Sequence, residues 1–293
     1  MQLKKFAIKI LREILRLFHP PLIAQYYILG FIDIGYANLY YIETKKFTID
    51  EIDRLLDVEK LYPKNILNYE DTINEIVINK KSIARLGDGE EFADNIFNDN
   101  PKYPLLKEKL KEILANGSDD RCLVCINNFN VFDKNVPVFY RKHFGRYWLG
   151  FNHKLQEISF NKEIFYGDAY SFLFYFDKND SDEKTQEKLR KIRSIWQDKK
   201  ILFVVSKNSK IFSDKKYFSN AAEKQYVLAP CEWAFSQYDT ILKNITENYD
   251  KDWIVYLELG SCATVLSYEL SRLGYQALDM GSFYDRIIKK FVG

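Results

Sequence analysis

The sequence predicts an α/β protein in which a mostly parallel sheet is flanked by helices. Residues 253–259 read as a strand, a glycine turn follows, and residues 262–273 have the apolar spacing of a helix. Gly274 ends this helix and residues 275–279 read as a second strand, so the segment is a βαβ unit with parallel strands. The continuous apolar run at residues 200–205 is typical of a strand that is buried on both faces.

The composition is that of a globular protein with a substantial core. The chain has 293 residues, of which 47% are hydrophobic and 29% are charged, and this length allows one large domain or two small ones. The formal net charge is only +2, so the overall charge does not favour a nucleic-acid partner. We therefore expect no binding to nucleic acid.

The amino end has the pattern of a membrane-surface helix. Residues 1–18 carry apolar side chains at helical spacing, with basic residues between them and a single acid. Residues 22–42 are apolar, but Asp33 near their centre would cost about 2.5–3.5 kcal/mol in a bilayer. We expect residues 1–47 to be a helical extension that attaches peripherally, with an ordinary helix packed on the body as the alternative. The expected location is the cytoplasm, at the inner face of the cell membrane.

Residues 48–293 are expected to form the main domain. Helical patterns occur at residues 71–80, at 104–115, which Gly117 ends, at 178–196 and at 232–247, and the pattern at Thr48 opens a short helix. Strand patterns occur at residues 122–126, 200–205 and 226–229, and residues 164–166 and 171–176 read as two strands or as a strand and a loop.

The four cysteines allow a metal site but favour buried thiols. Cys122 and Cys125 form a C-x-x-C pair, whereas Cys231 and Cys262 are isolated, so the second half of a zinc site is missing. Residues three apart on a strand point to opposite faces, and free cysteine packs as a small hydrophobic residue. We expect structural thiols, no disulfide framework and a reducing compartment.

The most informative segment is Arg85-Leu86-Gly87-Asp88-Gly89-Glu90, which follows a short apolar strand. The glycines let the backbone turn sharply, and the side chains of Asp88 and Glu90 share a face if the segment is extended. Two neighbouring carboxylates repel unless a cation lies between them, and Mg²⁺ prefers carboxylate and phosphate oxygens. The pair therefore predicts a divalent metal that also holds a diphosphate, with a surface turn as the alternative.

Two further features of the main domain are compatible with a phosphate ligand. The turn at Gly260 and Ser261 precedes a helix, and a helix N-terminus is a favourable seat for a phosphate, although a plain βα turn explains the pattern equally. Arg85 could add a fork of hydrogen-bond donors to a phosphate, or could be a salt-bridge partner. Asp279 falls at the carboxyl end of a strand, where open α/β sheets place ligand groups.

Four blocks in this order resemble the bacterial GT-D glycosyltransferases. The Arg85–Glu90 segment resembles the family's Arg-Phe-Gly-Asp-Gly-Glu motif, and residues 230–241 (PCEWAFSQYDTI) are similar to its Pro…Ala-Phe…Tyr-Asp…Ile segment. Residues 259–266 (LGSCATVL) and 274–281 (GYQALDMG) are similar to its glycine turn and to its Gly-Tyr-Gln-Ala-Ile-Asp-Ile-Gly ending. The resemblance covers roughly residues 70–285.

This resemblance implies a Rossmann-like enzyme that transfers a hexose from a nucleotide sugar, expected to be a UDP-sugar. Asp88 and Glu90 would hold Mn²⁺ or Mg²⁺ against the diphosphate, and a cation there offsets the charge of the leaving group. The residues expected to contact the donor are Arg85, Gly87, Gly260, Ser261 and Thr264. Asp279 is the candidate general base if the reaction inverts configuration, with a structural N-cap or turn role as the alternative. The acceptor would be a glycan, a lipid-linked glycan or a protein in the synthesis of bacterial surface polysaccharide or glycoprotein.

The sequence also departs from the family pattern. Residues 171–174 replace an Arg-Pro pair, residues 206–210 replace a glycine-rich segment that contains arginine, and Ser282 replaces a histidine. These changes keep open a degenerate module that binds a glycan or nucleotide without turnover. A third alternative is another nucleotide-dependent enzyme, such as a sugar-phosphate transferase or a phosphohydrolase.

Overall fold

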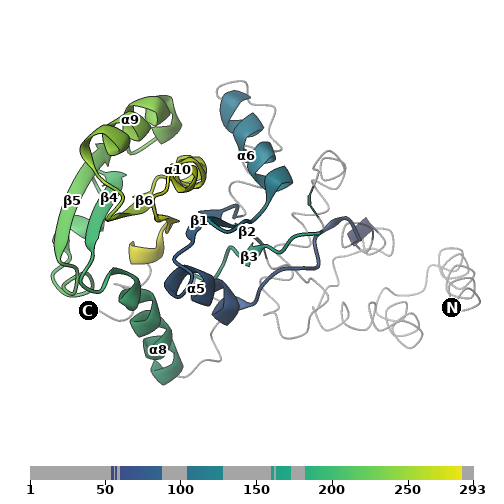
Figure 1. The fold of residues 1–293 in the computed structure, drawn as a ribbon, viewed down its shortest axis with the longest axis horizontal. Helices are drawn as coiled ribbons and strands as arrows, with labels where there is room; N and C mark the ends of the chain where they lie inside the picture. Colours follow the sequence, from purple (N-terminus) through teal and green to yellow (C-terminus); the bar gives the residue numbers. More distant parts are fainter. Residues whose placement is uncertain are drawn as a thin grey trace, which may run out of the picture. The chain divides into compact units, whose positions relative to one another are not determined.

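The computed structural model describes residues 54–55, 57, 60–87, 104–127, 160–161, 163–172 and 182–285 (Figure 1). The chain divides into two compact units, residues 1–62 with 129–157 and residues 63–128 with 158–293. The second unit contains nearly all of the described residues and carries the sheet. The expected extension at residues 1–47, its boundary and the short helix at Thr48 lie outside the described residues.

Seven parallel strands form one sheet in the order β3-β2-β1-β7-β6-β4-β5. The strands are β1 (Ser82–Arg85), β2 (Cys122–Ile126), β3 (Gly167–Asp168), β4 (Lys200–Ser206), β5 (Glu223–Ala229), β6 (Trp253–Glu258) and β7 (Ala277–Asp279). The predicted α/β class with a parallel sheet is therefore confirmed. In β4 the apolar run from Ile201 to Val205 is fully buried, as expected for a strand covered on both faces.

Helices cover both faces of the sheet (Figure 1). The connections β1→β2, β5→β6 and β6→β7 cross in one direction, and right-handed crossovers place their helices on the same face. These helices are α6 (Pro104–Asn116), α9 (Tyr238–Asn248) and α10 (Ser261–Arg272), and α10 contacts both others. The connection β3→β4 crosses in the opposite direction, so α8 (Asp182–Arg193) lies on the other face with α5 (Tyr69–Val77).

An aromatic cluster fills the core on the α8 face. Trp196, in the short 3-10 helix η2 (Ser194–Trp196), lies 4.8 Å from Phe218 between ring centroids. Phe218 in turn lies 4.9 Å from Phe203 of β4 and 5.5 Å from Tyr256 of β6. Tilted and edge-on pairs of this kind each contribute about 0.5–1.5 kcal/mol beyond the area that they bury. The cluster therefore fixes β4 and β6 side by side at the centre of this half of the sheet.

Most predicted elements are present, with shifted ends. The helix expected at 232–247 begins only at Tyr238, because Trp233 has a left-handed backbone (φ 56°) and the 3-10 helix η4 (Ala234–Gln237) follows it. The strand expected at 226–229 begins at Glu223, since it pairs with β4 along its whole length. The strand β3 is short and begins at Gly167, after the expected segment 164–166. In that segment, Tyr166 forms an isolated bridge with Ile66.

The cysteines behave as buried thiols, with one exception. Cys122, Cys125 and Cys262 are buried and free, whereas Cys231 is free and exposed. Within the described ranges, no three or more His, Cys, Asp or Glu side chains are grouped closely enough to hold a metal ion. Among the helices that the structure describes, none is both long and apolar enough to span a bilayer.

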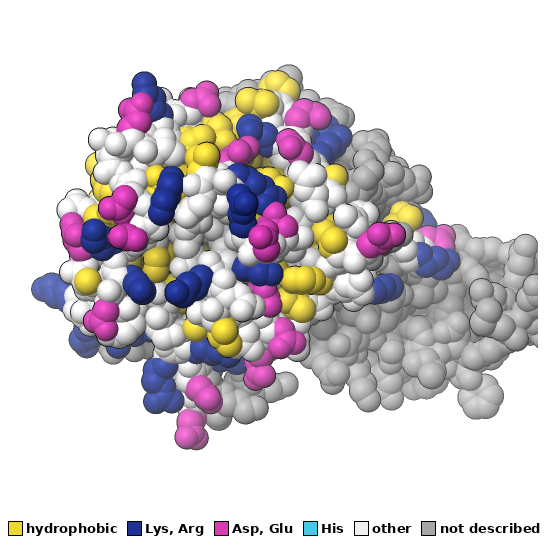
Figure 2. Space-filling view, in the orientation of Figure 1, with side chains coloured by type: hydrophobic (Ala, Val, Ile, Leu, Met, Phe, Trp, Pro, Cys, Tyr) yellow, Lys and Arg dark blue, Asp and Glu magenta, His cyan; other side chains and the backbone are white. Residues whose placement is uncertain are grey.

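Charged side chains are mixed over the visible surface. On the face drawn in Figure 2, Lys and Arg alternate with Asp and Glu across the described residues. This arrangement is typical of a solvated surface, where opposite charges are interspersed.

Candidate functional site

The topology of the sheet marks one position at which a ligand site is expected. From β4 the chain crosses to β5 on one side, and from β6 it crosses back to β7 on the other side. The helices after these adjacent strands therefore lie on opposite faces, which leaves a crevice at their carboxyl ends. Open α/β sheets bind ligands at such a switch point. Ser206 ends β4 and Glu258 ends β6 at this place.

A cavity of about 320 Å³ opens at this switch point. Its wall includes Ser206, Glu258, Gly260 and Ser261, together with the loop after β5 that carries Trp233. Gly260 has φ 56° and ψ −144°, a backbone conformation open essentially to glycine alone, and there is empty space where a Cβ would be. The glycine therefore allows the chain to turn from β6 into α10 without closing the cavity.

Among the described residues of this wall, Glu258 is the only acidic or basic amino acid. Its Oε1 accepts a hydrogen bond of 2.9 Å from the Tyr256 hydroxyl, and its Oε2 accepts one of 3.2 Å from the Ser209 hydroxyl. Burial raises the pKa of Glu258 to about 7, although both hydroxyl groups act in the opposite direction. A carboxyl group with a pKa near neutrality can accept or donate a proton at physiological pH.

The predicted residues Arg85, Thr264 and Asp279 form a buried network of their own. The Arg85 Nε donates to the backbone oxygen of Asp279 at 2.7 Å, and its Nη1 donates to the backbone oxygen of Ala169 at 3.0 Å. The Thr264 hydroxyl lies 2.8 Å from the Arg85 backbone oxygen and 2.9 Å from Oδ2 of Asp279. Gly281 packs against the guanidinium, which occupies the place where a Cβ would be.

The contacts of this network join β1, β7 and α10. Asp279 is only 3% exposed, and burial raises the pKa of its carboxyl group even though Arg85 opposes the shift. The ion pair itself is loose, with 3.7 Å between Arg85 Nη2 and Asp279 Oδ1. These are the contacts of residues that position strands, and the roles expected for Arg85 in phosphate binding and for Asp279 as a base stay predictions.

The predicted metal ligands follow directly on β1. The backbone N–H of Leu86 donates to the backbone oxygen of Cys125 at 2.8 Å, so β1 and β2 stay paired to the end of β1. Gly87 is the last described residue before the acidic pair. Asp88 and Glu90 lie outside the described residues. The roles of Asp88, Glu90 and Gly87, and the choice of Mn²⁺ or Mg²⁺, therefore stay predictions.

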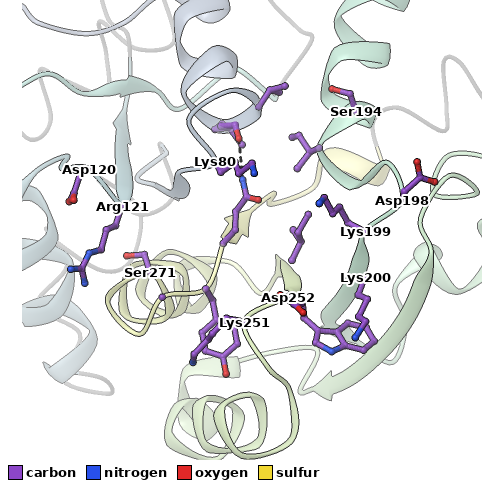
Figure 3. A pocket seen from close by; sticks show the side chains of 18 residues that line it. Lys80, Asp120, Arg121, Ser194, Asp198, Lys199, Lys200, Lys251, Asp252 and Ser271 are labelled. Atoms are coloured by element: carbon purple, nitrogen blue, oxygen red, sulfur yellow. Dashed lines mark hydrogen bonds between the residues drawn. The ribbon is translucent and has the colours of Figure 1, made fainter.

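A larger hollow of about 870 Å³ lies at the opposite edge of the sheet (Figure 3). It opens at the amino ends of β4 and β6. Figure 3 shows charged side chains of both signs around it, such as Lys199, Lys200, Asp198 and Asp252. Ligand groups in open α/β sheets lie at the carboxyl ends of the strands. The smaller cavity at the switch point is therefore the candidate site.

Glu258 and Trp233 were not predicted as site residues from the sequence. Glu258 ends a strand and stands two residues before the glycine turn, and this position could have marked it as a site residue. Trp233 is 49% exposed at the rim of the cavity. Its position at the rim could not be predicted from the sequence, because the segment has the apolar pattern of a helix.

Comparison with known proteins agrees with this architecture. The family described as Glycosyltransferase GT-D fold matches residues 83–286. The chain is 25% identical to the probable glycosyl transferase Gly of Streptococcus gordonii, over 74% of this chain and 32% of the relative. It is 26% identical to glycosyltransferase GlyD of Streptococcus pneumoniae, over 78% of this chain and 29% of the relative. The matched region thus corresponds to about a third of each relative's length.

Solved structures share the fold. A domain described as the highly conserved domain of unknown function 1792, with a distinct glycosyltransferase fold, has a TM-score of 0.69 at 24% identity and covers 80% of this chain and 83% of its own. A new glycosyltransferase (DUF1792) from Streptococcus sanguinis has a TM-score of 0.64 at 25% identity, over 76% and 82% of the two chains. Because the family match includes every strand of the sheet from Ile83 onward, the chain belongs to the GT-D family of glycosyltransferases.

Proposed function

We propose that this protein is a metal-dependent enzyme that transfers a hexose from a UDP-sugar to a glycan or lipid-linked acceptor in the synthesis of bacterial surface polysaccharide or glycoprotein. The observation that carries the proposal is the family match over residues 83–286, which includes Asp88 and Glu90. The central strand β1 ends three residues before Asp88 in the sequence, and open α/β sheets bind ligands at the carboxyl ends of their strands. A protein acceptor fits the same chemistry.

The chemistry divides between the acidic pair and the switch-point cavity. Asp88 and Glu90 would hold Mn²⁺ or Mg²⁺, and the cation would offset the negative charge of the departing nucleoside diphosphate. Carboxylates are the ligands that these hard cations prefer. Gly260 and Ser261 begin α10 in the cavity wall, where the positive end of the helix dipole favours a negatively polarised group of the donor.

The direct test is release of UDP from UDP-hexoses by the purified protein with Mn²⁺. Asp88→Asn and Glu90→Gln should each lower the rate by about 100-fold or more, since loss of a preorganised electrostatic contact costs about 2.7–4 kcal/mol in the transition state. Asp120→Asn, at the opposite edge of the sheet, is the matched control and should keep full activity. Wild-type rates for the Glu90→Gln protein would exclude this assignment.

A module that binds without turnover is the second candidate. It is favoured by Arg85, whose guanidinium donates to Asp279 and Ala169 within the protein and therefore has fewer donors left for a phosphate. UDP-hexose would then bind, but no UDP would be released with any divalent metal or acceptor.

The basic segment at residues 1–18 is proposed to bring the enzyme to the membrane surface. Its lysines and arginines would be attracted to anionic lipids, with about 1 kcal/mol for each charge near the surface. The full chain should float with vesicles of anionic lipid at low salt, and a chain that begins at residue 19 should not. Equal flotation of both proteins would rule out this attachment.

A further inference from the structure

The cavity at the switch point combines an aromatic side chain with hydroxyl and carboxylate groups. Its described wall includes Trp233 and Glu258, together with Ser206 at the end of β4 and Ser261 at the start of α10. None of the described residues in this wall is a lysine or an arginine. A volume of about 320 Å³ is at the lower end of the range for small-molecule sites. The cavity thus suits a single ring rather than a whole nucleotide sugar.

Trp233 presents an aromatic surface at the rim. The side chain is 49% exposed, although Trp is usually buried, and the residue adopts a left-handed backbone (φ 56°, ψ 40°) that is uncommon outside glycine. The turn is fixed by a hydrogen bond of 2.9 Å from the Ser236 N–H to the Trp233 backbone oxygen. A large aromatic ring held at the edge of a polar cavity offers an apolar surface to the C–H face of a sugar or to another flat ring.

Glu258 provides an acceptor for a ligand hydroxyl group in the cavity wall. A carboxylate has about four lone-pair positions on its two oxygens. One position on Oε1 is used by Tyr256 and one on Oε2 by Ser209, at 2.9 and 3.2 Å, and the backbone of Tyr284 donates a further hydrogen bond to this carboxyl group. About one position therefore remains, and it matches a hydroxyl group of a ligand. A phosphate matches poorly, because it would place a second negative charge beside a carboxylate without a cation.

We propose that the switch-point cavity binds a sugar ring, one hydroxyl group of which donates to Glu258 while the ring packs against Trp233. This inference rests on the proposed function, because a nucleotide-sugar enzyme meets two such rings, the ribose of the nucleotide and a hexose. Both rings present the same chemistry to the cavity, and the experiment distinguishes them.

The experiment measures ligand binding by saturation-transfer NMR and calorimetry with the full chain. The probes are uridine, 2′,3′-dideoxyuridine, a methyl hexoside and UDP-glucose with Mn²⁺. Trp233→Ala and Glu258→Gln should each weaken binding of the preferred ring about tenfold, in line with the loss of one aromatic contact or one charge-assisted hydrogen bond. The matched controls are Phe165→Ala, an exposed aromatic residue before β3, and Glu269→Gln, an acid of α10 that pairs with Lys109.

The outcomes distinguish three cases: the cavity binds the ribose, it binds the hexose, or the inference is wrong. The cavity binds the ribose if the two variants bind uridine, but not the hexoside, more weakly than the wild type does, and if the wild type binds dideoxyuridine poorly. Weaker binding of the hexoside assigns the hexose. If dideoxyuridine binds as well as uridine, the base occupies the cavity and the inference is wrong. If UDP release by the wild type is normal and both variants bind as it does, the inference fails while the proposed function stands. A wild type that binds no probe contradicts both.

Discussion

Arg85 and Asp279 stabilise the fold through their backbones as well as their charges. The Arg85 backbone N–H lies 3.2 Å from Oδ2 of Asp279, and the Arg85 Nε donates to the backbone oxygen of the same residue. Thr264 adds a hydroxyl donor from α10. The sequence indicated Asp279 as a ligand group because it ends a strand, and Arg85 either as a phosphate donor or as a salt-bridge partner. Their mutual contacts could not be predicted, since they depend on β1 and β7 being neighbours in the sheet.

We expect Asp279→Ala to be strongly destabilising. It leaves the guanidinium of Arg85 buried without its carboxylate partner, and breaking a buried pair in this way costs about 3–5 kcal/mol. Asp279→Asn keeps an oxygen that can accept from Thr264 and should cost less, about 1–2 kcal/mol. Urea unfolding measures both values. Equal stability of Asp279→Ala and the wild type would show that the network does not stabilise the fold.

Glu258 predicts a specific dependence of stability on pH. Burial raises its pKa from an ordinary value of 4.5 to about 7, so the folded protein holds a proton that the unfolded chain releases. This stabilisation is complete below pH about 4.5 and is lost as the pH rises through about 7. Glu258→Gln cannot ionise. Its stability relative to the wild type should therefore rise by about 2 kcal/mol between pH 5 and pH 8.

Urea unfolding at several pH values measures this difference. The comparison of two proteins at each pH removes contributions from other groups near the site, such as Asp285, whose charge also raises the pKa of Glu258. A difference that does not change with pH would show that Glu258 is ionised normally in the folded protein.

At the scale of elements, residue patterns predicted whether a segment is a helix or a strand better than they predicted its first and last residues. The buried strand at 200–205 and the helix at 104–115 are confirmed almost to the residue, because an apolar run and an amphipathic stripe that Gly117 ends (φ 65°) are unambiguous. The helix at 232–247 begins late because Trp233 turns the chain, which no periodicity reveals. The site residues missed by the sequence lie in this turn and at the end of β6.

The burial of β2 predicts that its cysteines react slowly with thiol reagents. Cys122 and Cys125 lie on a strand that is buried along its whole length, and burial raises the pKa of Cys122 to about 12. Burial also raises the pKa of Cys262 to about 12, whereas Cys231 is exposed. Thiolate, not thiol, is the reactive form, so a native protein should show one fast thiol towards Ellman's reagent and four in denaturant. Cys231→Ser should remove the fast phase, and a second fast thiol would contradict the burial of β2.

At the scale of the whole molecule, the order of strands creates the candidate site. The βαβ unit and the parallel sheet could be predicted from local patterns, and the resemblance of four blocks predicted the family, which is confirmed. The reversal between β4 and β6 could not be predicted, because it depends on which strands become neighbours. Glu258 and the loop of Trp233 are separated from each other in sequence and meet in the cavity wall only through this order.

The stability of the whole molecule should report on metal and nucleotide together. If Asp88 and Glu90 bind a divalent ion that in turn binds a diphosphate, UDP with Mn²⁺ should raise the melting temperature much more than either alone. At 100 times the Kd the gain is about 2.7 kcal/mol, which corresponds to roughly 5–10 °C for a domain of this size. EDTA should abolish the shift, and Asp88→Asn should abolish it without lowering the melting temperature of the unliganded protein. A shift with UDP that is unchanged by EDTA would mean that the diphosphate is held by protein groups alone, and the acidic pair would then lose its assigned role.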